Sequence, residues 1–283
     1  MCKKILYVIS LIVVLGLTGV ASAQLTEIWW DNESGDMLWN NPVNWDRDGQ
    51  DGQPSELNFV GHKLDGLQNV LIAGPSVNAT MDCMSLGDSE GADAYMYFLG
   101  ATMHTVYHEG GRGNWLIGVL GDGHGHMYMD GGTLDTDTDF CVAYMGTGDL
   151  RIIAGTIRAQ GAVAIGAMNA GHIDLYGGTI IGEGISPHSA APGMPFLMNP
   201  YGVGSASMDV RGDGTLLARG DWVGLINGYV ASGWIYAGEP GYTIDVSLVD
   251  IDGITYTQVT AVPEPATIAL IGLGGLALIR KRR

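Results

Sequence analysis

Hydrophobic and polar residues alternate through three stretches of the chain that share one layout. The stretches begin at Gly125, Gly148 and Gly171, so the layout has a constant period of about 23 residues. Alternation with a period of two is typical of a β-strand with one buried face. We therefore expect Ile152 to point into the core and its neighbour Arg151 to point into solvent.

A second and a third short strand follow in each repeat. Glycine residues separate the first strand from the second and permit the positive φ of a tight turn. The second strands begin at Thr133, Thr156 and Thr179, which keep the same spacing. This spacing also aligns Ile117 with Phe140 in the third strand.

Several short strands within one period leave no room for a helical repeat. The period instead predicts an all-β body, a parallel β-solenoid (β-helix) whose coils stack about 4.8 Å apart. Stacking would make Tyr128, Arg151 and Asp174 exposed neighbours and would place Asp135 beside Arg158. The alternative is a β-sandwich, which would need mainly antiparallel pairing.

The pattern divides the chain into five parts. We expect a signal peptide at 1–23, an N-terminal cap with the first strands at 24–92, solenoid repeats at 93–240, a hairpin cap at 241–260 and a sorting tail at 261–283. The hairpin is expected because two alternating runs flank Asp252-Gly253, a pair typical of tight β-turns.

Two departures from the period indicate insertions. Eight extra residues lie within about 103–114 and twelve within about 181–200. Long insertions on a solenoid often carry function. The insertion residues that we single out for chemistry are His108, Glu109, Arg112 and His188.

The start of the chain has the pattern of a secretory signal peptide. Lys3 and Lys4 precede the apolar run 5–20, and the small residues Ala21-Ser22-Ala23 precede Gln24. Signal peptidase is expected to cleave between Ala23 and Gln24. A transmembrane anchor is the alternative, but the apolar run is short for one.

The end of the chain combines three features in a fixed order. Val262-Pro263-Glu264-Pro265 is followed by the apolar run 266–279 and then by Arg280-Lys281-Arg282-Arg283. As a helix, the apolar run would span about 21 Å, which is short for a bilayer core of about 30 Å. The basic residues favour a cytoplasmic end, with the body on the outer side of the membrane.

This tail resembles the PEP-CTERM sorting signal of Gram-negative bacteria. The resemblance implies transient insertion in the inner membrane and processing near Pro263–Pro265 by an exosortase. It also implies an extracellular or cell-envelope destination, often linked to exopolysaccharide and biofilm. Separately, the aromatic and polar stretch 28–58 is similar to the opening of many exported, autotransporter-passenger-like β-helix proteins.

The stretch 24–261 is strongly acidic. It has 7 Lys and Arg residues against 29 Asp and Glu residues, a net charge of −22. This charge argues against nucleic acid and anionic membrane surfaces as partners. It is compatible with Ca²⁺, a hard cation that takes oxygen ligands, and with an exported protein that stays in solution. We expect no cofactor other than this ion.

The spacing of three aspartates allows one isolated calcium site. Asp135, Asp137 and Asp139 alternate, so their carboxylates could converge from one strand face. The equivalent positions one repeat later carry no carboxylates, so no ladder of ions is expected. His124 and His126 would lie on one side of an extended chain, without further zinc ligands at a suitable spacing.

The tryptophans near the start allow two interpretations. Trp39 and Trp45 could stack on sugar rings, but they more often close an open solenoid end, which we favour. Cys83 and Cys141 could pair in an oxidising compartment, although two cysteines are no disulfide framework.

The sequence contains no catalytic motif that we could identify. A G-x-S-x-G nucleophile elbow is missing, and ion-pair ladders explain Arg151 and Arg158 without catalysis. We therefore expect a non-enzymatic surface or matrix protein with a structural or adhesive role and a possible link to exopolysaccharide. The alternative is a carbohydrate-binding or polysaccharide-cleaving β-helix, a lyase or hydrolase.

Overall fold

The computed structural model describes residues 27–47, 50–51, 57–60, 69–87, 91–107 and 113–264. The expected signal peptide, with Ala21, Ala23 and Gln24, lies outside these residues, as do Pro265, the apolar run 266–279 and the basic end. Within the described part, no helix is long and apolar enough to cross a membrane.

The fold is mostly β, with two sheets whose strands pair mainly in parallel. Sheet A contains the strands β1 (Glu27–Trp30), β2 (Trp45–Arg47), β3 (Gln50–Asp51), β4 (Leu57–Val60), β7 (Met84–Leu86), β10 (Trp115–Ile117), β12 (Phe140–Val142), β14 (Val163–Ile165) and β17 (Phe196–Met198).

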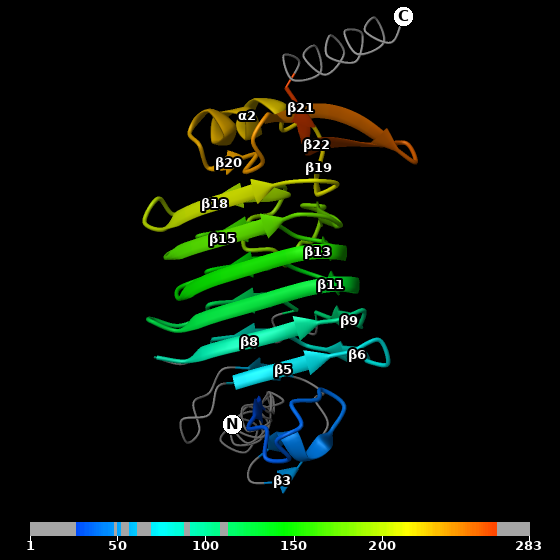
Figure 1. Cartoon of the computed structure of the whole chain (residues 1–283), viewed down its shortest axis with the longest axis vertical. Helices are drawn as coiled ribbons and strands as arrows, with labels where there is room; N and C mark the ends of the chain where they lie inside the picture. Colours follow the sequence, from blue (N-terminus) through cyan, green and yellow to red (C-terminus); the bar gives the residue numbers. More distant parts are fainter. Residues whose placement is uncertain are drawn as a thin grey trace, which may run out of the picture.

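Sheet B is larger and contains the long strands of the repeat (Figure 1). Its strands are β5 (Asn69–Ala73), β6 (Asn78–Met81), β8 (Asp93–Phe98), β9 (Thr102–Thr105), β11 (His124–Thr136), β13 (Thr147–Ala159), β15 (Ala170–Leu175), β16 (Thr179–Gly182), β18 (Ser205–Val210), β19 (Thr215–Arg219), β20 (Ile235–Tyr236), β21 (Tyr242–Ile251) and β22 (Ile254–Pro263). One 3₁₀ turn, η1 (Pro42–Asn44), and one helix, α2 (Val223–Ala231), complete the described elements.

The chain returns to the same two sheets with each repeat. From β10 it passes to β11 in sheet B, back to β12 in sheet A, and on to β13 in sheet B. We call one strand of sheet A together with the segment of sheet B that follows it a rung. In sheet B the predicted period is confirmed, because Thr133 pairs with Thr156 and Thr156 with Thr179 in parallel. Predominantly parallel pairing excludes the β-sandwich alternative.

The alignment predicted for the third strand was wrong upstream of β12. Trp115 pairs with Phe140 and Ile117 pairs with Val142, whereas a constant period would have placed Ile117 beside Phe140. The connection from β10 to β11 is two residues longer than the connection from β12 to β13. It begins at Gly118, whose φ of 69° suits glycine.

Each insertion is divided between two turns. The chain advances ten residues from Thr105 to Trp115, whereas the equivalent segment of the next rung, from Thr136 to Phe140, advances four. Six of the eight extra residues therefore lie between Thr105 and Trp115. The other two lie in the longer β10–β11 connection. The second insertion divides in the same way, with ten extra residues between β16 and β17 and two between β17 and β18.

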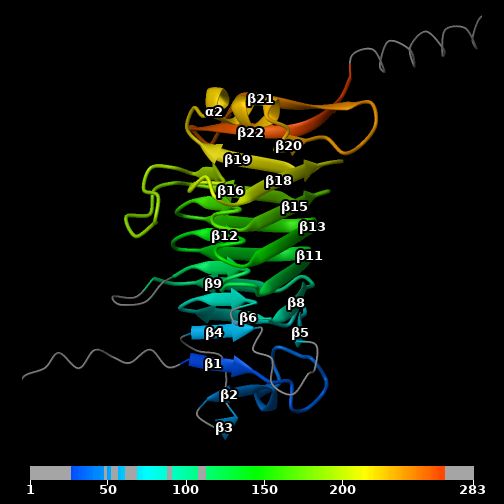
Figure 2. The same cartoon turned by 90° about the vertical axis from the view of Figure 1, so that its left-hand side faces the viewer.

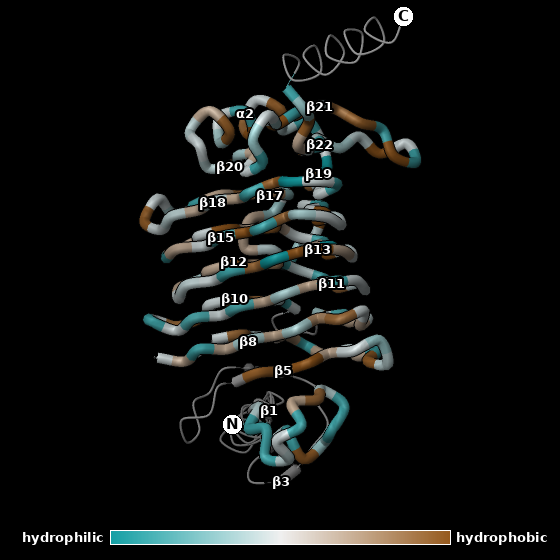
Figure 3. Tube along the Cα trace, in the orientation of Figure 1, coloured by the Kyte–Doolittle hydropathy of each residue, from teal (hydrophilic) through white to brown (hydrophobic). Residues whose placement is uncertain are grey.

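The core runs along the stack between the two sheets. Met129, Ile152 and Leu175 follow one another on successive rungs, and each is fully buried. Arg151 is exposed, so the predicted inward and outward assignment is confirmed. The tube in Figure 3 shows the corresponding changes of hydropathy along the strands.

Both ends of the stack carry structure that differs from the rungs. At the C-terminal end lie α2 and an antiparallel hairpin, β21–β22, whose tip is Asp252-Gly253 (Figure 2). Strand β22 also pairs antiparallel with β19. It continues to Pro263, three residues past the boundary expected at 260.

Candidate functional site

Two columns of polar and aromatic side chains run across the outer face of sheet B. Successive members pair in register on neighbouring strands, in the order β8, β11, β13, β15 and β18. The first column consists of Tyr95, His126, Asp149, His172 and Ser207. The second column consists of Tyr97, Tyr128, Arg151, Asp174 and Asp209.

The first column is centred on His126. The ring of Tyr95 stacks on its imidazole, with centroids 4.5 Å apart and planes 12° apart. Nδ1 of His126 lies 3.1 Å from an Asp149 carboxylate oxygen, and Nε2 lies 3.2 Å from Asp93. The hydrogen bond to Asp149 raises the pKa of His126 and, reciprocally, lowers the pKa of Asp149.

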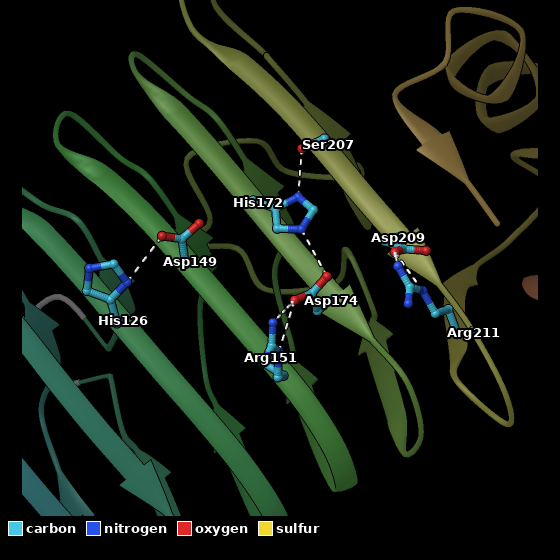
Figure 4. Close-up of polar contacts among 8 residues, drawn as sticks. All are labelled: His126, Asp149, Arg151, His172, Asp174, Ser207, Asp209 and Arg211. Carbon is cyan, nitrogen blue, oxygen red and sulfur yellow. Dashed lines mark hydrogen bonds and ion pairs between the residues drawn. The ribbon is translucent and has the colours of Figure 1, made fainter. Parts of the chain in front are cut away.

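The second column is centred on an ion pair between Arg151 and Asp174 (Figure 4). Nε and Nη2 of Arg151 donate to the same oxygen of Asp174, at 3.0 and 2.7 Å. His172 bridges the columns, because Nε2 lies 3.0 Å from Asp174 and Nδ1 lies 2.7 Å from the Ser207 hydroxyl. Burial opposes ionisation of Asp174, but hydrogen bonds from Arg151 and His172 outweigh it and lower its pKa.

The columns continue toward the C-terminal end with a buried carboxylate. Asp209 binds Arg211 and accepts a hydrogen bond of 2.7 Å from the backbone N–H of Gly238. The guanidinium groups of Arg211 and Arg151 lie 4.9 and 5.4 Å from the ring centroid of Tyr176. Cation–π contacts of this kind stabilise both arginines against the sheet.

Between the columns lies a groove of about 350 Å³, which we call the sheet-B groove. Side chains from β8, β11, β13 and β15 line it, so it crosses four neighbouring strands. Tyr95, Tyr97, His126 and Tyr128 form its aromatic end, and Arg151 with Asp174 forms its charged end.

The calcium site expected at Asp135, Asp137 and Asp139 is not formed. Strand β11 ends at Thr136, so the last two carboxylates follow a bend and do not share its face. Asp137 lies 2.8 Å from His104 Nε2 and accepts from the Tyr107 N–H.

The Asp139 carboxylate is hydrogen-bonded to other groups of the protein. Its carboxylate accepts from the Ala162 and Ala190 N–H groups and from the Ser189 hydroxyl, at 2.6 to 2.8 Å. Within the described ranges, no group of three or more His, Cys, Asp or Glu side chains could hold a metal ion. Asp139 instead joins the second insertion to the stack.

The tryptophans named for glycan stacking are packed inside the fold. Trp39 is 4% exposed and Trp45 is fully buried. Their centroids lie 4.8 Å apart, and Nε1 of Trp45 donates to the Trp39 carbonyl at 2.8 Å. Trp30 packs against Trp45 at 5.0 Å. This packing leaves neither ring a face for a sugar.

The two insertions meet on the side of the stack. His188, from the second insertion, stacks on Tyr107 with centroids 3.6 Å apart and planes 9° apart. The second insertion projects from the stack in the left of Figure 2. His108, Glu109 and Arg112 of the first insertion lie outside the described residues.

The remaining candidates form no reactive site. No disulfide joins Cys83 to Cys141, and both side chains are buried. Burial raises the pKa of the Cys141 thiol, which disfavours the reactive thiolate. The His124 and His126 rings face the same side, with centroids 6.5 Å apart.

Sequence reasoning predicted the neighbours Tyr128, Arg151 and Asp174 of the second column. It did not find the first column, and it missed Tyr95 and Tyr97. The strand that carries them, β8, pairs with β11 at a longer offset than the period, with Tyr97 opposite Tyr128. The signal that could have located Tyr95 and Tyr97 is the alternation of Met96 and Phe98. It matches the alternation of Met127 and Met129, which lie beyond the first insertion.

The first part of the sorting motif is ordered against the body. Val262 and Pro263 pair with Thr243 and Tyr242 in the terminal hairpin, and the Glu264 N–H donates to the Gly241 carbonyl at 2.8 Å. Pro263 and Glu264 are exposed.

Comparison with known proteins identifies the family of this C-terminal segment. Residues 261–283 match the family model of the PEP-CTERM protein-sorting motif. No curated protein and no solved structure matches the chain. The motif implies that this is an exported protein, sorted to the cell surface and processed by an exosortase.

Proposed function

We propose that the body is a parallel β-solenoid that serves as a structural or adhesive component of the cell surface or extracellular matrix. The observation that carries the proposal is the register of sheet B, in which equivalent side chains lie above one another on successive rungs. Stacked rungs of this kind bury one continuous core and present a long regular surface.

The polar groups on that surface favour a scaffold over a catalyst. Arg151 is held by Asp174, and His126 lies between two carboxylates. Contacts of this kind stabilise a ladder and hold these groups in ion pairs and hydrogen bonds with one another, which disfavours their use as catalytic acids or bases. We therefore propose that the protein has no lyase or hydrolase activity, with or without Ca²⁺.

Cellular location tests the surface role. Antibody labelling of intact producing cells, together with fractionation of envelope and matrix, should find the processed protein on the surface and in the matrix. A strain without exosortase should retain the unprocessed chain in the inner membrane. Processed protein confined to the periplasm would contradict the proposal.

A turnover assay tests the second part of the proposal. Neutral and acidic polysaccharides are incubated with the protein in millimolar Ca²⁺, and no new chain ends should appear. Reproducible cleavage that Arg151→Ala abolishes would establish an enzyme instead. Carbohydrate binding without cleavage is the second candidate function, and the aromatic end of the sheet-B groove is the observation that favours it.

A further inference from the structure

We propose that the sheet-B groove binds a neutral glycan, an oligosaccharide without carboxylate, sulfate or phosphate groups. The proposal names a ligand for the surface role proposed above and in that sense rests on it. Its evidence is separate, because it comes from the side chains that line the groove.

Tyrosine rings supply an apolar surface at one end of the groove. Tyr97 and Tyr128 lie on adjacent rungs, with centroids 6.0 Å apart and planes 49° apart. Tyr97 is 40% exposed although both residues flanking it in sequence, Met96 and Phe98, are buried in the core. An exposed aromatic ring on a rigid strand is suited to pack against the C–H face of a sugar ring.

The other end of the groove supplies hydrogen-bonding groups. The Arg151 side chain is 51% exposed although its Nε and Nη2 donate to Asp174. His172 adds a ring nitrogen to the same network. Sugar hydroxyl groups both donate and accept, so they can join a network of charged donors and acceptors without adding charge.

The charges near the groove select against anionic sugars. Asp149 and Asp174 line the groove, and Asp93 contacts His126 at its edge. Arg151 is neutralised by its contact with Asp174. A uronate or sulfate chain would therefore meet carboxylates within a body that already carries a net charge of −22 over residues 24–261.

The direction of the groove fits an extended chain. It crosses β8, β11, β13 and β15, and four neighbouring strands at the usual spacing cover about 14 Å between the first and the last. An oligosaccharide lying across the strands would place successive sugar rings over successive rungs. The ligand is therefore an oligosaccharide of several units and not a monosaccharide.

Calorimetric titration of the full chain tests the proposal, in a detergent without a sugar headgroup. The probes are oligosaccharides derived from cellulose, mannan and xylan, and polygalacturonate oligosaccharides of matched length. We expect at least one neutral probe to bind and polygalacturonate to bind more weakly. Tyr97→Ala should weaken the neutral probe about tenfold, because it removes the stacking surface.

Two further variants make the result specific to the groove. Tyr97→Phe keeps the ring and should bind like the wild type. Tyr201→Ala removes a tyrosine that is 53% exposed on a turn outside the groove, and it should also leave affinity unchanged. Thermal unfolding of each variant shows whether the fold is intact.

Three results would each overturn the proposal: no binding of any neutral probe, tighter binding of polygalacturonate, or undiminished affinity of Tyr97→Ala. The proposed surface role is tested by a different measurement, the arrival of the protein at the cell surface. Tyr97→Ala should still reach the cell surface, whereas failure of the proposed function would appear as wild-type protein missing from the surface, whatever it binds.

Discussion

At the scale of single residues, neighbours on one strand face different environments. Ile152 is fully buried between Met129 and Leu175, whereas Arg151 lies on the outer face. Ile152→Asp would place an unpaired charge in the core and should cost more than about 4 kcal/mol of unfolding free energy. Urea unfolding followed by circular dichroism measures this loss.

The control is Arg151→Asp, one residue away. It loses the ion pair with Asp174 and places like charges on adjacent rungs, so a cost on the order of 1 kcal/mol is expected. Equal destabilisation by the two substitutions would contradict the inward and outward assignment of β13.

The pair formed by His126 and Asp149 should make stability depend on pH. The folded-state pKa of His126 is raised above 6.5, so its contribution is present below that pH and is lost as the pH rises through the raised pKa. The folded-state pKa of Asp149 is lowered below 3.8, so its contribution is present above that pH and is lost as the pH falls through the lowered pKa. The pair therefore stabilises the fold most between pH 3.8 and 6.5.

Thermal unfolding between acid and neutral pH tests this window. His126→Gln should lower the melting temperature inside the window more than above it. Asp149→Asn removes the same interaction, so the double variant should add little to either single one. A constant difference between wild type and His126→Gln at every pH would contradict the assignment.

At the scale of elements, one buried carboxylate joins the stack to the C-terminal hairpin. Glu183 accepts hydrogen bonds from Arg158 of β13 at 2.9 and 2.5 Å and from Arg219 of β19 at 3.3 Å. The Tyr256 hydroxyl of β22 donates to it at 3.1 Å. Arg158 lies beside Asp135 in register, as predicted, yet its ion pair is with Glu183.

Glu183→Gln should therefore destabilise the hairpin end of the molecule. The two arginines lose their shared carboxylate but are partly exposed, so we expect a loss of about 2 kcal/mol. Compared with the wild type, hydrogen exchange in Glu183→Gln should be faster in β22 and unchanged in β11. Asp135→Asn is the matched control and should leave exchange in both strands unchanged. Uniform exchange across both strands would show that Glu183 does not act at this junction.

Sequence alone predicted the strands of the three regular repeats and their buried faces, because alternation records which side of a strand meets the core. It could not fix every register. A shift of two residues keeps the alternation intact, so Ile117 fitted beside Phe140 as well as beside its actual partner, Val142.

The candidate groove was harder to predict than the core. Its members lie at outward positions, which tolerate many residue types because they face solvent. Such positions therefore show no periodic pattern in the sequence. The first insertion also separates Tyr95 and Tyr97 from the regular repeats. The expected calcium site assumed that β11 continued past Thr136, whereas the chain bends there to connect with sheet A.

At the scale of the whole molecule, the sorting motif determines where the protein goes. Replacing Pro263-Glu264-Pro265 with alanines should leave the chain unprocessed and retained in the membrane, because the extended recognition segment is lost. Mass spectrometry of envelope and released fractions measures the C-terminus. Wild-type protein released with Arg283 still present would contradict processing at this motif.

The antiparallel contact of β22 with β19 has a consequence for the order of folding during export. Rungs depend on their nearest neighbours, so they can assemble as each segment emerges. The strand that covers β19 is Ile254–Pro263, whose last residues belong to the sorting tail. A partly translocated chain therefore exposes an open sheet edge that can pair with a second chain. We therefore expect rapid completion of translocation to limit such pairing between chains.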